Sequence, residues 1–216
     1  MISSNLKKRI ATSIPLIFLL YLSFYYSYIL IISLILVTLI SYFEFKGLTS
    51  KIFKTEIKLS FYKLLLDGLF IIYLVIFSVL IFSSISQDKL KLYTLYLFAV
   101  CIFSDIGGLI FGTIFKGRKL TKISPNKTIS GSVGSFIMSL VLVPFFYFIS
   151  EDNFIDVYEI IALTALVCFF CQLGDLIISF LKRKAKVKDT SNILPGHGGL
   201  LDRIDGILLG LPLGIV

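Results

Sequence analysis

Long apolar runs separated by short charged segments constrain this chain more than any other feature. A helix needs about 17–25 apolar residues to cross a bilayer, and lipid offers no partner for unsatisfied backbone groups, so the spanning segments must be helical. Hydrophobic residues make up 57% of the 216 residues, more than a soluble core can bury. The pattern predicts an all-α, polytopic integral membrane protein with about seven transmembrane helices, at 10–26, 28–45, 64–84, 92–115, 132–150, 157–181 and 200–216.

The basic residues indicate how the chain is threaded through the membrane. If the N-terminus is cytoplasmic and the seven spans alternate, all but two of the 21 Lys and Arg residues lie on the cytoplasmic side, the exceptions being Lys89 and Lys91. This agrees with the positive-inside rule. The net charge of +8 is therefore explained by topology, and we expect no nucleic-acid partner. The location expected is a bacterial inner membrane, with the chemistry facing the cytoplasm.

The chain divides into two predicted parts. Residues 1–91 form N-terminal membrane helices with about three spans, and the first span is retained because no small-residue cleavage site follows it. Residues 92–216 form a C-terminal catalytic membrane domain with about four spans. Its cytoplasmic loops, near 116–131 and 182–199, are the stretches with room for a site outside the membrane.

Four carboxylates lie near the cytoplasmic ends of three predicted spans. An acidic side chain at mid-bilayer costs about 2.5–3.5 kcal/mol on insertion scales, less near the interface, so each needs a reason. Because they share one depth and one side of the membrane, we expect them to form a common site: Asp105, Asp175, Asp202 and Asp205.

Helical spacing places several small or polar residues on shared faces. Gln172, Asp175 and Ser179 follow at i, i+3 and i+7 and therefore share one face. Glycines at every fourth position allow another helix to approach closely. Two such stripes are present: Gly206, Gly210 and Gly214 after Asp202, and Gly108 and Gly112 after Asp105.

The residue types near the carboxylates favour phosphate chemistry. Hard divalent cations such as Mg²⁺ take carboxylates and complete their shell with water and substrate phosphates. The lone His197 argues against zinc, which needs several nitrogen or sulfur ligands. The basic, hydroxyl- and glycine-containing loops suit polyphosphate binding. Together these features predict phosphoryl or nucleotidyl transfer with a lipid as one substrate.

Other conspicuous residues have simpler interpretations. Cys168 and Cys171 lie on one apolar helix and are expected to be core residues rather than a metal or redox site. Asp67, one turn after Lys63, is expected to form a structural pair. Glu44, at the end of the second span, is expected to be interfacial.

The motifs near the C-terminus resemble a known family. Ser179-Phe-Leu-Lys-Arg183, Lys188-Asp189 and Leu194-Pro-Gly-His-Gly-Gly-Leu-Leu-Asp-Arg-Ile-Asp205 closely resemble the C-terminal motif of phosphatidate cytidylyltransferases. Further segments that fit are Gln172–Asp175, Asp105–Gly108 and the Ser-Pro-x-Lys-Thr run at 124–128 with Gly131. Two departures are Ser130, where the family usually has an acidic residue, and the shorter chain.

The resemblance implies that CTP and phosphatidic acid give CDP-diacylglycerol and pyrophosphate, for phospholipid biosynthesis. It implies catalytic roles for Asp175, Lys188, Asp189, Asp202 and Asp205. The implied substrate-binding residues are Ser124, Lys127, Thr128, Lys182, Arg183, His197, Gly198, Gly199 and Arg203. Mg²⁺ or another divalent cation would be held by Asp175 and Asp202, with Asp105 and Asp205 assisting. A homodimer is a further expectation.

Two other classes of function remain open. A CTP-dependent polyprenol or phytol kinase, or a synthase of a related CDP-lipid, would use a similar site. A small ion-coupled transporter would use the carboxylates as ion or proton sites.

Product analysis separates these alternatives. We expect a CDP-lipid and pyrophosphate from the cytidylyltransferase. A kinase would instead leave a lipid phosphomonoester and CDP, and a transporter would turn over no CTP.

Overall fold

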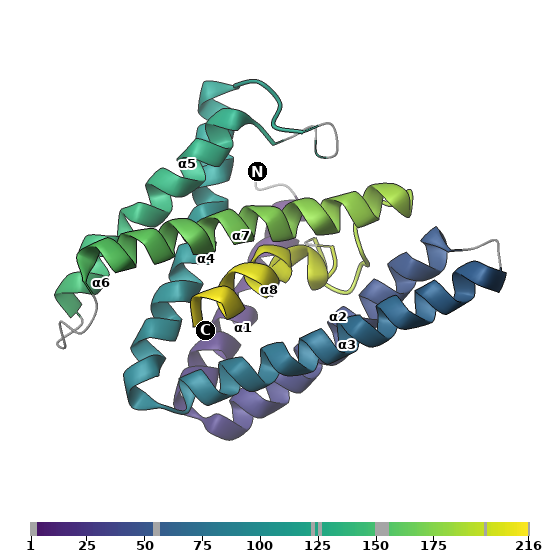
Figure 1. Cartoon of the computed structure of the whole chain (residues 1–216), viewed down its shortest axis with the longest axis horizontal. Coiled ribbons are helices and arrows are strands. Elements are labelled where there is room, and N and C mark those ends of the chain that lie inside the picture. Colours follow the sequence, from purple (N-terminus) through teal and green to yellow (C-terminus); the bar gives the residue numbers. More distant parts are fainter. Residues whose placement is uncertain are drawn as a thin grey trace. The chain divides into compact units, whose positions relative to one another are not determined.

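The fold was examined in a computed structural model, which describes residues 4–53, 57–121, 124, 127–149, 156–196 and 198–215. The described residues are mainly helical, with two isolated β-bridges and no strand. The predicted all-α class is therefore confirmed. The helices are α1 (Ser4–Tyr25), α2 (Ser27–Ile52), α3 (Ile57–Ile85), α4 (Asp88–Phe115), α5 (Ile129–Leu140), α6 (Leu142–Ile149), α7 (Val157–Lys184) and α8 (Leu201–Ile215) (Figure 1).

Each predicted span contains a helix, and the fifth is divided into α5 and α6 at Val141. Among the described residues, five helical stretches are long and apolar enough to cross a membrane: 27–52, 60–85, 90–115, 129–149 and 157–184. The apolar part of α1, Ile14–Tyr25, is shorter, and so is α8. A polytopic membrane protein is confirmed, and the number seven stays a prediction.

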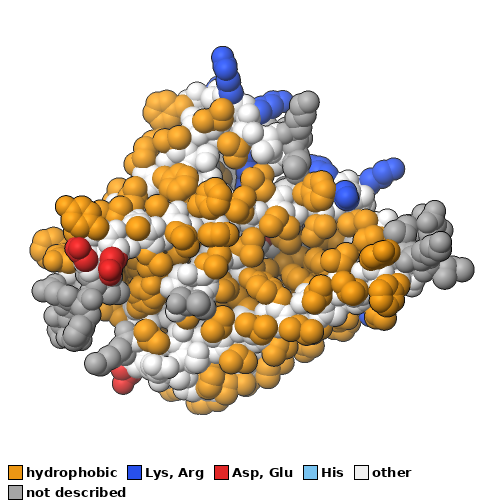
Figure 2. Space-filling model, in the orientation of Figure 1, with side chains coloured by type: hydrophobic (Ala, Val, Ile, Leu, Met, Phe, Trp, Pro, Cys, Tyr) orange, Lys and Arg blue, Asp and Glu red, His pale blue; other side chains and the backbone are white. Residues whose placement is uncertain are grey.

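Many large apolar side chains point outward from these helices. Phe148 is 88% exposed and Leu64 71% exposed. Hydrophobic side chains cover most of the face seen in Figure 2. A water-soluble protein rarely exposes continuous apolar surface of this kind, so lipid is the solvent that suits it.

The chain forms two compact units. The first combines residues 1–86 with residues 181–204, and the second combines residues 87–180 with residues 205–216. The sequence-based division put the whole segment after residue 91 in one domain. That division stays a prediction; in the structure, Thr190 and Ser191 of the segment 181–204 donate hydrogen bonds to Glu44 of α2, in the first compact unit.

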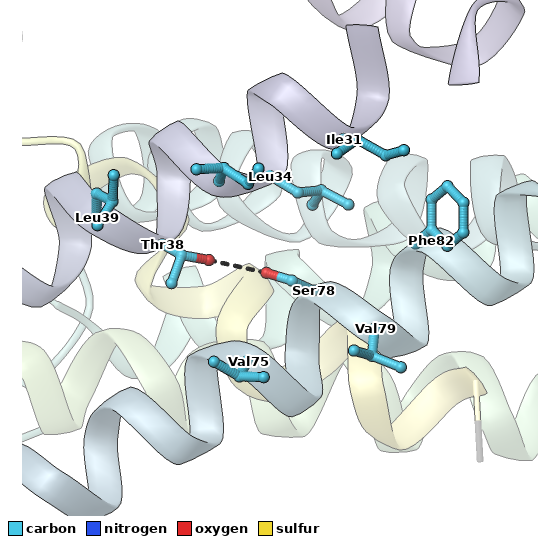
Figure 3. A pocket seen from close by; sticks show the side chains of 9 residues that line it. Ile31, Leu34, Thr38, Leu39, Val75, Ser78, Val79 and Phe82 are labelled. Atoms are coloured by element: carbon cyan, nitrogen blue, oxygen red, sulfur yellow. Dashed lines mark hydrogen bonds between the residues drawn. The ribbon is translucent and has the colours of Figure 1, made fainter. Parts of the chain in front are cut away.

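In the first unit, α2 and α3 pack along each other. Phe45 of α2 stacks on Phe70 of α3 at a centroid distance of 3.9 Å. Thr38 and Ser78 form a 2.9 Å hydrogen bond at the base of an apolar groove between the two helices (Figure 3). The two hydroxyls lie among aliphatic side chains and satisfy each other. Their hydrogen bond therefore favours one position of α2 along α3.

In the second unit, glycines bring helices into close contact. Gly108 and Gly112 of α4 face the start of α5, where a Cβ on Gly112 would lie 3.2 Å from Thr128 Oγ1. Gly206 and Gly210 of α8 face Cys171, and Gly214 faces Leu97 and Val167. Both predicted glycine stripes are therefore confirmed as packing surfaces.

The cysteines lie in the core of the same unit. Cys101, Cys168 and Cys171 are all buried free thiols, and Cys171 Sγ lies 3.1 Å from Cys101 Sγ. Their surroundings are apolar helices, as predicted for Cys168 and Cys171.

The crossing of α4 and α5 gives a first prediction. Gly107→Ala would place its Cβ on the backbone carbonyl of Gly134, which cannot move aside cheaply. We expect a loss of about 1–3 kcal/mol of stability, as for other overpacked cores, measured as a lower thermal unfolding midpoint in detergent. The matched control is Gly47→Ala on α2, where a Cβ meets nothing within 4 Å. This control should be neutral or slightly stabilising, because alanine has the higher helix propensity. Equal effects of the two substitutions would contradict the packing argument.

Candidate functional site

The signature loop, residues 185–200, joins α7 to α8 and lies in the first unit; the structure describes all of it except His197. Its path requires several left-handed residues. Lys186 has φ 55° just after α7, and Gly196 and Gly198 have φ 81° and 87°. Leu194 and Gly198 exchange two backbone hydrogen bonds of 2.9 and 3.1 Å across a tight turn. The glycines of the motif are thus needed for the turn itself.

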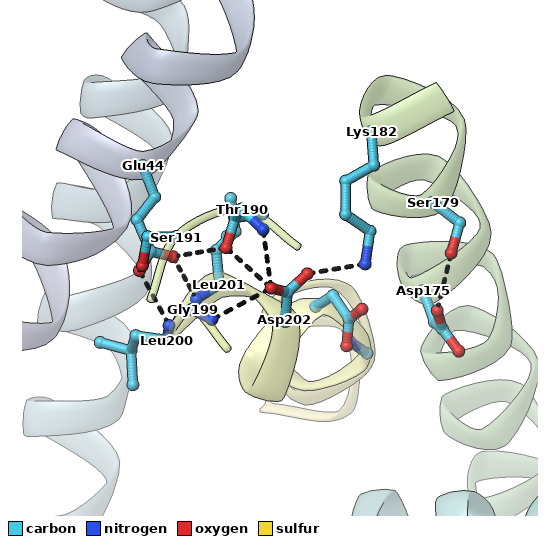
Figure 4. Close-up of polar contacts among 12 residues, drawn as sticks. Glu44, Asp175, Ser179, Lys182, Thr190, Ser191, Gly199, Leu200, Leu201 and Asp202 are labelled. Atoms are coloured by element: carbon cyan, nitrogen blue, oxygen red, sulfur yellow. Dashed lines mark hydrogen bonds and ion pairs between the residues drawn. The ribbon is translucent and has the colours of Figure 1, made fainter. Parts of the chain in front are cut away.

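Asp202, in the first turn of α8, closes this loop (Figure 4). Its Oδ2 accepts hydrogen bonds from the backbone N–H groups of Thr190 (2.8 Å) and Gly199 (3.1 Å), and Thr190 Oγ1 lies 3.0 Å away. Its Oδ1 forms a 2.6 Å ion pair with Lys182 at the end of α7. The Asp202 side chain is only 5% exposed. One carboxylate therefore holds both ends of the loop.

The environment of Asp202, which lies outside the five candidate spans, also determines its charge. Burial acts to raise the pKa of Asp202, but hydrogen bonds from Lys182, Thr190 and Gly199 and the charge of Lys182 outweigh it. The pKa of Asp202 is therefore held below its usual value, and the group is anionic near neutral pH.

Glu44 of α2 is a functional candidate that the sequence analysis missed. It was predicted to be interfacial, which stays a prediction, but its side chain is buried in the protein, at 4% exposed. Its carboxylate accepts hydrogen bonds from Thr190 Oγ1, Ser191 Oγ and the N–H groups of Leu200 and Leu201 (Figure 4). The available signal was an acidic residue inside a predicted span, the same signal that drew attention to Asp105.

Asp67 of α3 is also buried, at 4% exposed. It accepts a 2.7 Å hydrogen bond from Thr49 of α2. This is the structural role expected for Asp67, with Thr49 as a partner; the pairing with Lys63 stays a prediction.

A second group of predicted residues surrounds Asp175 in the second unit. Lys127 forms a 2.5 Å ion pair with Asp175 Oδ2, and Ser179 donates to Oδ1 at 3.2 Å. One turn earlier on α7, Gln172 accepts a 2.5 Å hydrogen bond from Ser132 of α5. The predicted shared face of Gln172, Asp175 and Ser179 is confirmed, and it meets the segment that begins at Lys127.

A short hairpin positions Lys127. Leu120 N–H donates to the Lys127 carbonyl and Ile129 N–H to that of Arg118, on either side of the Lys119–Thr128 bridge. Thr128 then caps α5 by accepting a 3.0 Å hydrogen bond from Gly131 N–H. The backbone thus directs Lys127 toward α7.

Ser130 stabilises the base of this hairpin. Its hydroxyl accepts from Gly117 N–H at 3.2 Å and lies 3.1 Å from Thr128 Oγ1. The position where the family usually has an acidic residue is thus occupied by a neutral group with a structural role.

The remaining predicted residues are more dispersed. Asp205 is buried and accepts a hydrogen bond from Gly206 N–H, whereas Asp105 is exposed. Ser124 N–H donates to Thr121 Oγ1. Exposed side chains are those of Arg183, Lys188, Asp189 and Arg203, and His197 lies outside the described residues.

The carboxylates differ in their suitability for a metal. The Asp175 side chain is 32% exposed, and carboxylate oxygens are ligands that Mg²⁺ accepts, but an ion there would have to displace Lys127 from Oδ2. Asp202 Oδ2 accepts from the Thr190 and Gly199 amides and Oδ1 is paired with Lys182, so an ion at Asp202 would have to displace the lysine. Within the described ranges, no group of three or more His, Cys, Asp or Glu side chains is arranged to hold a metal ion. A site shared by four carboxylates stays a prediction.

Hydrogen exchange tests the role assigned to Asp202. Asp202→Ala removes the acceptor of the Thr190 and Gly199 amides, so we expect protection of peptides across 189–200 to fall about 10-fold or more. Asp202→Asn keeps one carbonyl oxygen for these amides and should lose less protection. Asp189→Asn is the control, because Asp189 is exposed and should leave protection unchanged. Unchanged exchange in Asp202→Ala would contradict the loop-closing role.

The chain is similar in sequence to known proteins. A model of the cytidylyltransferase family matches residues 2–216. Proteins named phosphatidate cytidylyltransferase are 44% identical over 122 residues in Staphylococcus haemolyticus, 45% over 122 residues in Staphylococcus saprophyticus and 42% over 123 residues in Staphylococcus aureus. Each match covers 56% of this chain and 46% of the relative, so the chain spans about half the length of the relatives it matches. The chain belongs to the cytidylyltransferase family.

Proposed function

We propose that the chain transfers the cytidylyl group of CTP to phosphatidic acid, forming CDP-diacylglycerol and pyrophosphate. The observation that carries the proposal is the family match along residues 2–216. The name of the staphylococcal relatives supports the choice of substrate pair. The apolar helices support a lipid substrate, because a membrane protein can bind one without extracting it from the bilayer.

The chemistry asks the protein for positioning and charge neutralisation. A phosphate oxygen of phosphatidic acid attacks the α-phosphorus of CTP. A bond forms between this oxygen and the α-phosphorus. The bond between the α-phosphorus and the oxygen that bridges to the β-phosphorus breaks, and pyrophosphate leaves with that electron pair. The nucleophile is already anionic near neutral pH, so no strong general base is required.

Two lysines, each paired with an aspartate, are proposed to bind phosphate groups of the substrates. Lys127 and Lys182 each form an ion pair with a carboxylate, at 2.5 and 2.6 Å, and their side chains are 23% and 15% exposed. The pairs hold each ammonium in place before substrate arrives. Binding of the triphosphate would replace or share the carboxylate partner, and the exposed Lys188, Arg183 and Arg203 would add further positive charge.

Mg²⁺ is proposed as the cofactor, with Asp175 as the carboxylate that would hold it. When bound, the ion would neutralise phosphate charge and orient the reacting groups. Asp175 supplies the more exposed carboxylate, and Ser179 beside it supplies a further oxygen. Contributions from Asp105 and Asp205 are part of the same proposal.

The proposed location is the bacterial inner membrane, with the site facing the cytoplasm. The distribution of Lys and Arg between the apolar segments supports this orientation. The bacterial relatives support a bacterial source for the chain. A homodimer is proposed as the assembly.

The test uses purified protein in detergent with radiolabelled CTP, phosphatidic acid and Mg²⁺. We expect a labelled CDP-lipid and pyrophosphate, no product when the metal is chelated, and a loss of at least about 100-fold in Asp175→Asn, in keeping with removal of a group that positions charge. Ser50→Ala is the control, because the Ser50 hydroxyl donates to the Lys46 carbonyl one turn earlier in its own helix. A folded protein that makes no CDP-lipid from any acceptor would overturn the proposal.

A further inference from the structure

The Glu44 carboxylate is bound by four donors from one short stretch of chain. Oε1 accepts from Ser191 Oγ at 2.5 Å and Leu200 N–H at 2.9 Å. Oε2 accepts from Thr190 Oγ1 at 2.9 Å and Leu201 N–H at 2.7 Å. Each oxygen therefore accepts from one hydroxyl and one backbone amide. The two hydroxyls come from residues 190–191 and the two amides from residues 200–201, on either side of the turn in the signature loop.

Because Glu44 is buried, its carboxylate depends on these hydrogen bonds. A carboxylate that is 4% exposed has lost its water and must be satisfied by protein donors. The described donors are neutral, and two of them are amides at the N-terminus of α8, where the helix dipole favours negative charge. The Glu44 carboxylate is thus matched to the beginning of α8 and to the hydroxyls of Thr190 and Ser191.

The Gly199 backbone lies so close to Thr190 and Glu44 that only glycine fits at this position. A Cβ on Gly199 would overlap Thr190 Oγ1 and would lie 2.7 and 2.9 Å from the Glu44 oxygens. The second glycine of the Gly198-Gly199 pair therefore has a packing reason that involves α2. The predicted phosphate-contacting role of Gly199 does not account for this closeness.

Thr190 connects Glu44 to Asp202. Its hydroxyl lies 2.9 Å from Glu44 Oε2 and 3.0 Å from Asp202 Oδ2, and its single proton is available to both oxygens. Asp202 in turn holds Lys182. A displacement of the loop at Glu44 would therefore move the Asp202–Lys182 pair as well.

We propose that Glu44 is a positioning residue: from the N-terminal helices it sets the conformation of the signature loop and the placement of the Asp202–Lys182 pair for reaction. Its effect on turnover rests on the proposed cytidylyl transfer, whereas its effect on the loop does not. The N-terminal helices thereby contribute a residue on which the C-terminal motif depends.

Spin labelling tests the loop independently of activity. Ile193 is 52% exposed, and the three native cysteines are buried, so Ile193→Cys offers one accessible thiol for a nitroxide. We expect Glu44→Gln to increase the label's mobility, because its amide nitrogen cannot accept the bonds that one carboxylate oxygen now receives. Ser191→Ala removes one donor to Glu44 together with the acceptor of the Ile193 N–H, so it should also increase the label's mobility, and it guards against a Glu44 variant that does not fold.

The matched control is Asp67→Asn. It removes a second buried carboxylate from the same pair of helices, but one that is bound by Thr49 and not by the loop. We expect the label spectrum of Asp67→Asn to match that of the parent. Equal mobility in the parent and in Glu44→Gln, or an equal increase in Asp67→Asn, would overturn the proposal.

Kinetics form the second readout. A displaced catalytic group costs about 100-fold in rate, so we expect Glu44→Gln to lower kcat/KM for CTP by about that factor and Asp67→Asn to leave it unchanged. A mobile loop with unchanged turnover would reject the positioning role while keeping the loop contact. If the parent itself makes no CDP-lipid, the proposed function fails, and the spin-label result still decides whether Glu44 holds the loop.

Discussion

A carboxylate removed from water has to be given donors, and this requirement organises the first unit of the protein. Glu44 obtains them from Thr190, Ser191 and the first amides of α8, segments about 150 positions away in sequence. Asp202 obtains its donors from the same loop and from Lys182. Because both carboxylates are buried, the loop between α7 and α8 has to follow a path that satisfies them, with glycine at the points of closest approach.

The same principle applies to the lysines that are proposed to bind phosphate. Lys127 and Lys182 are each paired with an aspartate, and each pair is partly buried. Such pairs contribute little net stability, since the cost of desolvation offsets much of the attraction. Their value lies in holding the ammonium groups at defined positions. Exposed residues such as Lys188 and Arg203 suit longer-range attraction of anions.

Much of the architecture was predictable because lipid imposes simple rules on sequence. Each apolar run proved to contain a helix, and the stripes of Gly206, Gly210 and Gly214 and of Gly108 and Gly112 proved to be packing surfaces. Length alone could not establish that 200–216 crosses a membrane, since α8 has 15 residues with Pro212 inside it. The burial of Glu44 could not be predicted, because its donors lie in a distant part of the chain.

By itself, the sequence determined the helical class, the membrane environment, the packing faces and the motif that links the chain to its family, since these depend on composition, local period and residue order. Tertiary structure alone decided that Lys127 pairs with Asp175, that Lys182 pairs with Asp202, and that Glu44 binds the signature loop. Hydrogen bonds between residues far apart in the chain depend on how helices bring them together, and no local pattern encodes that meeting.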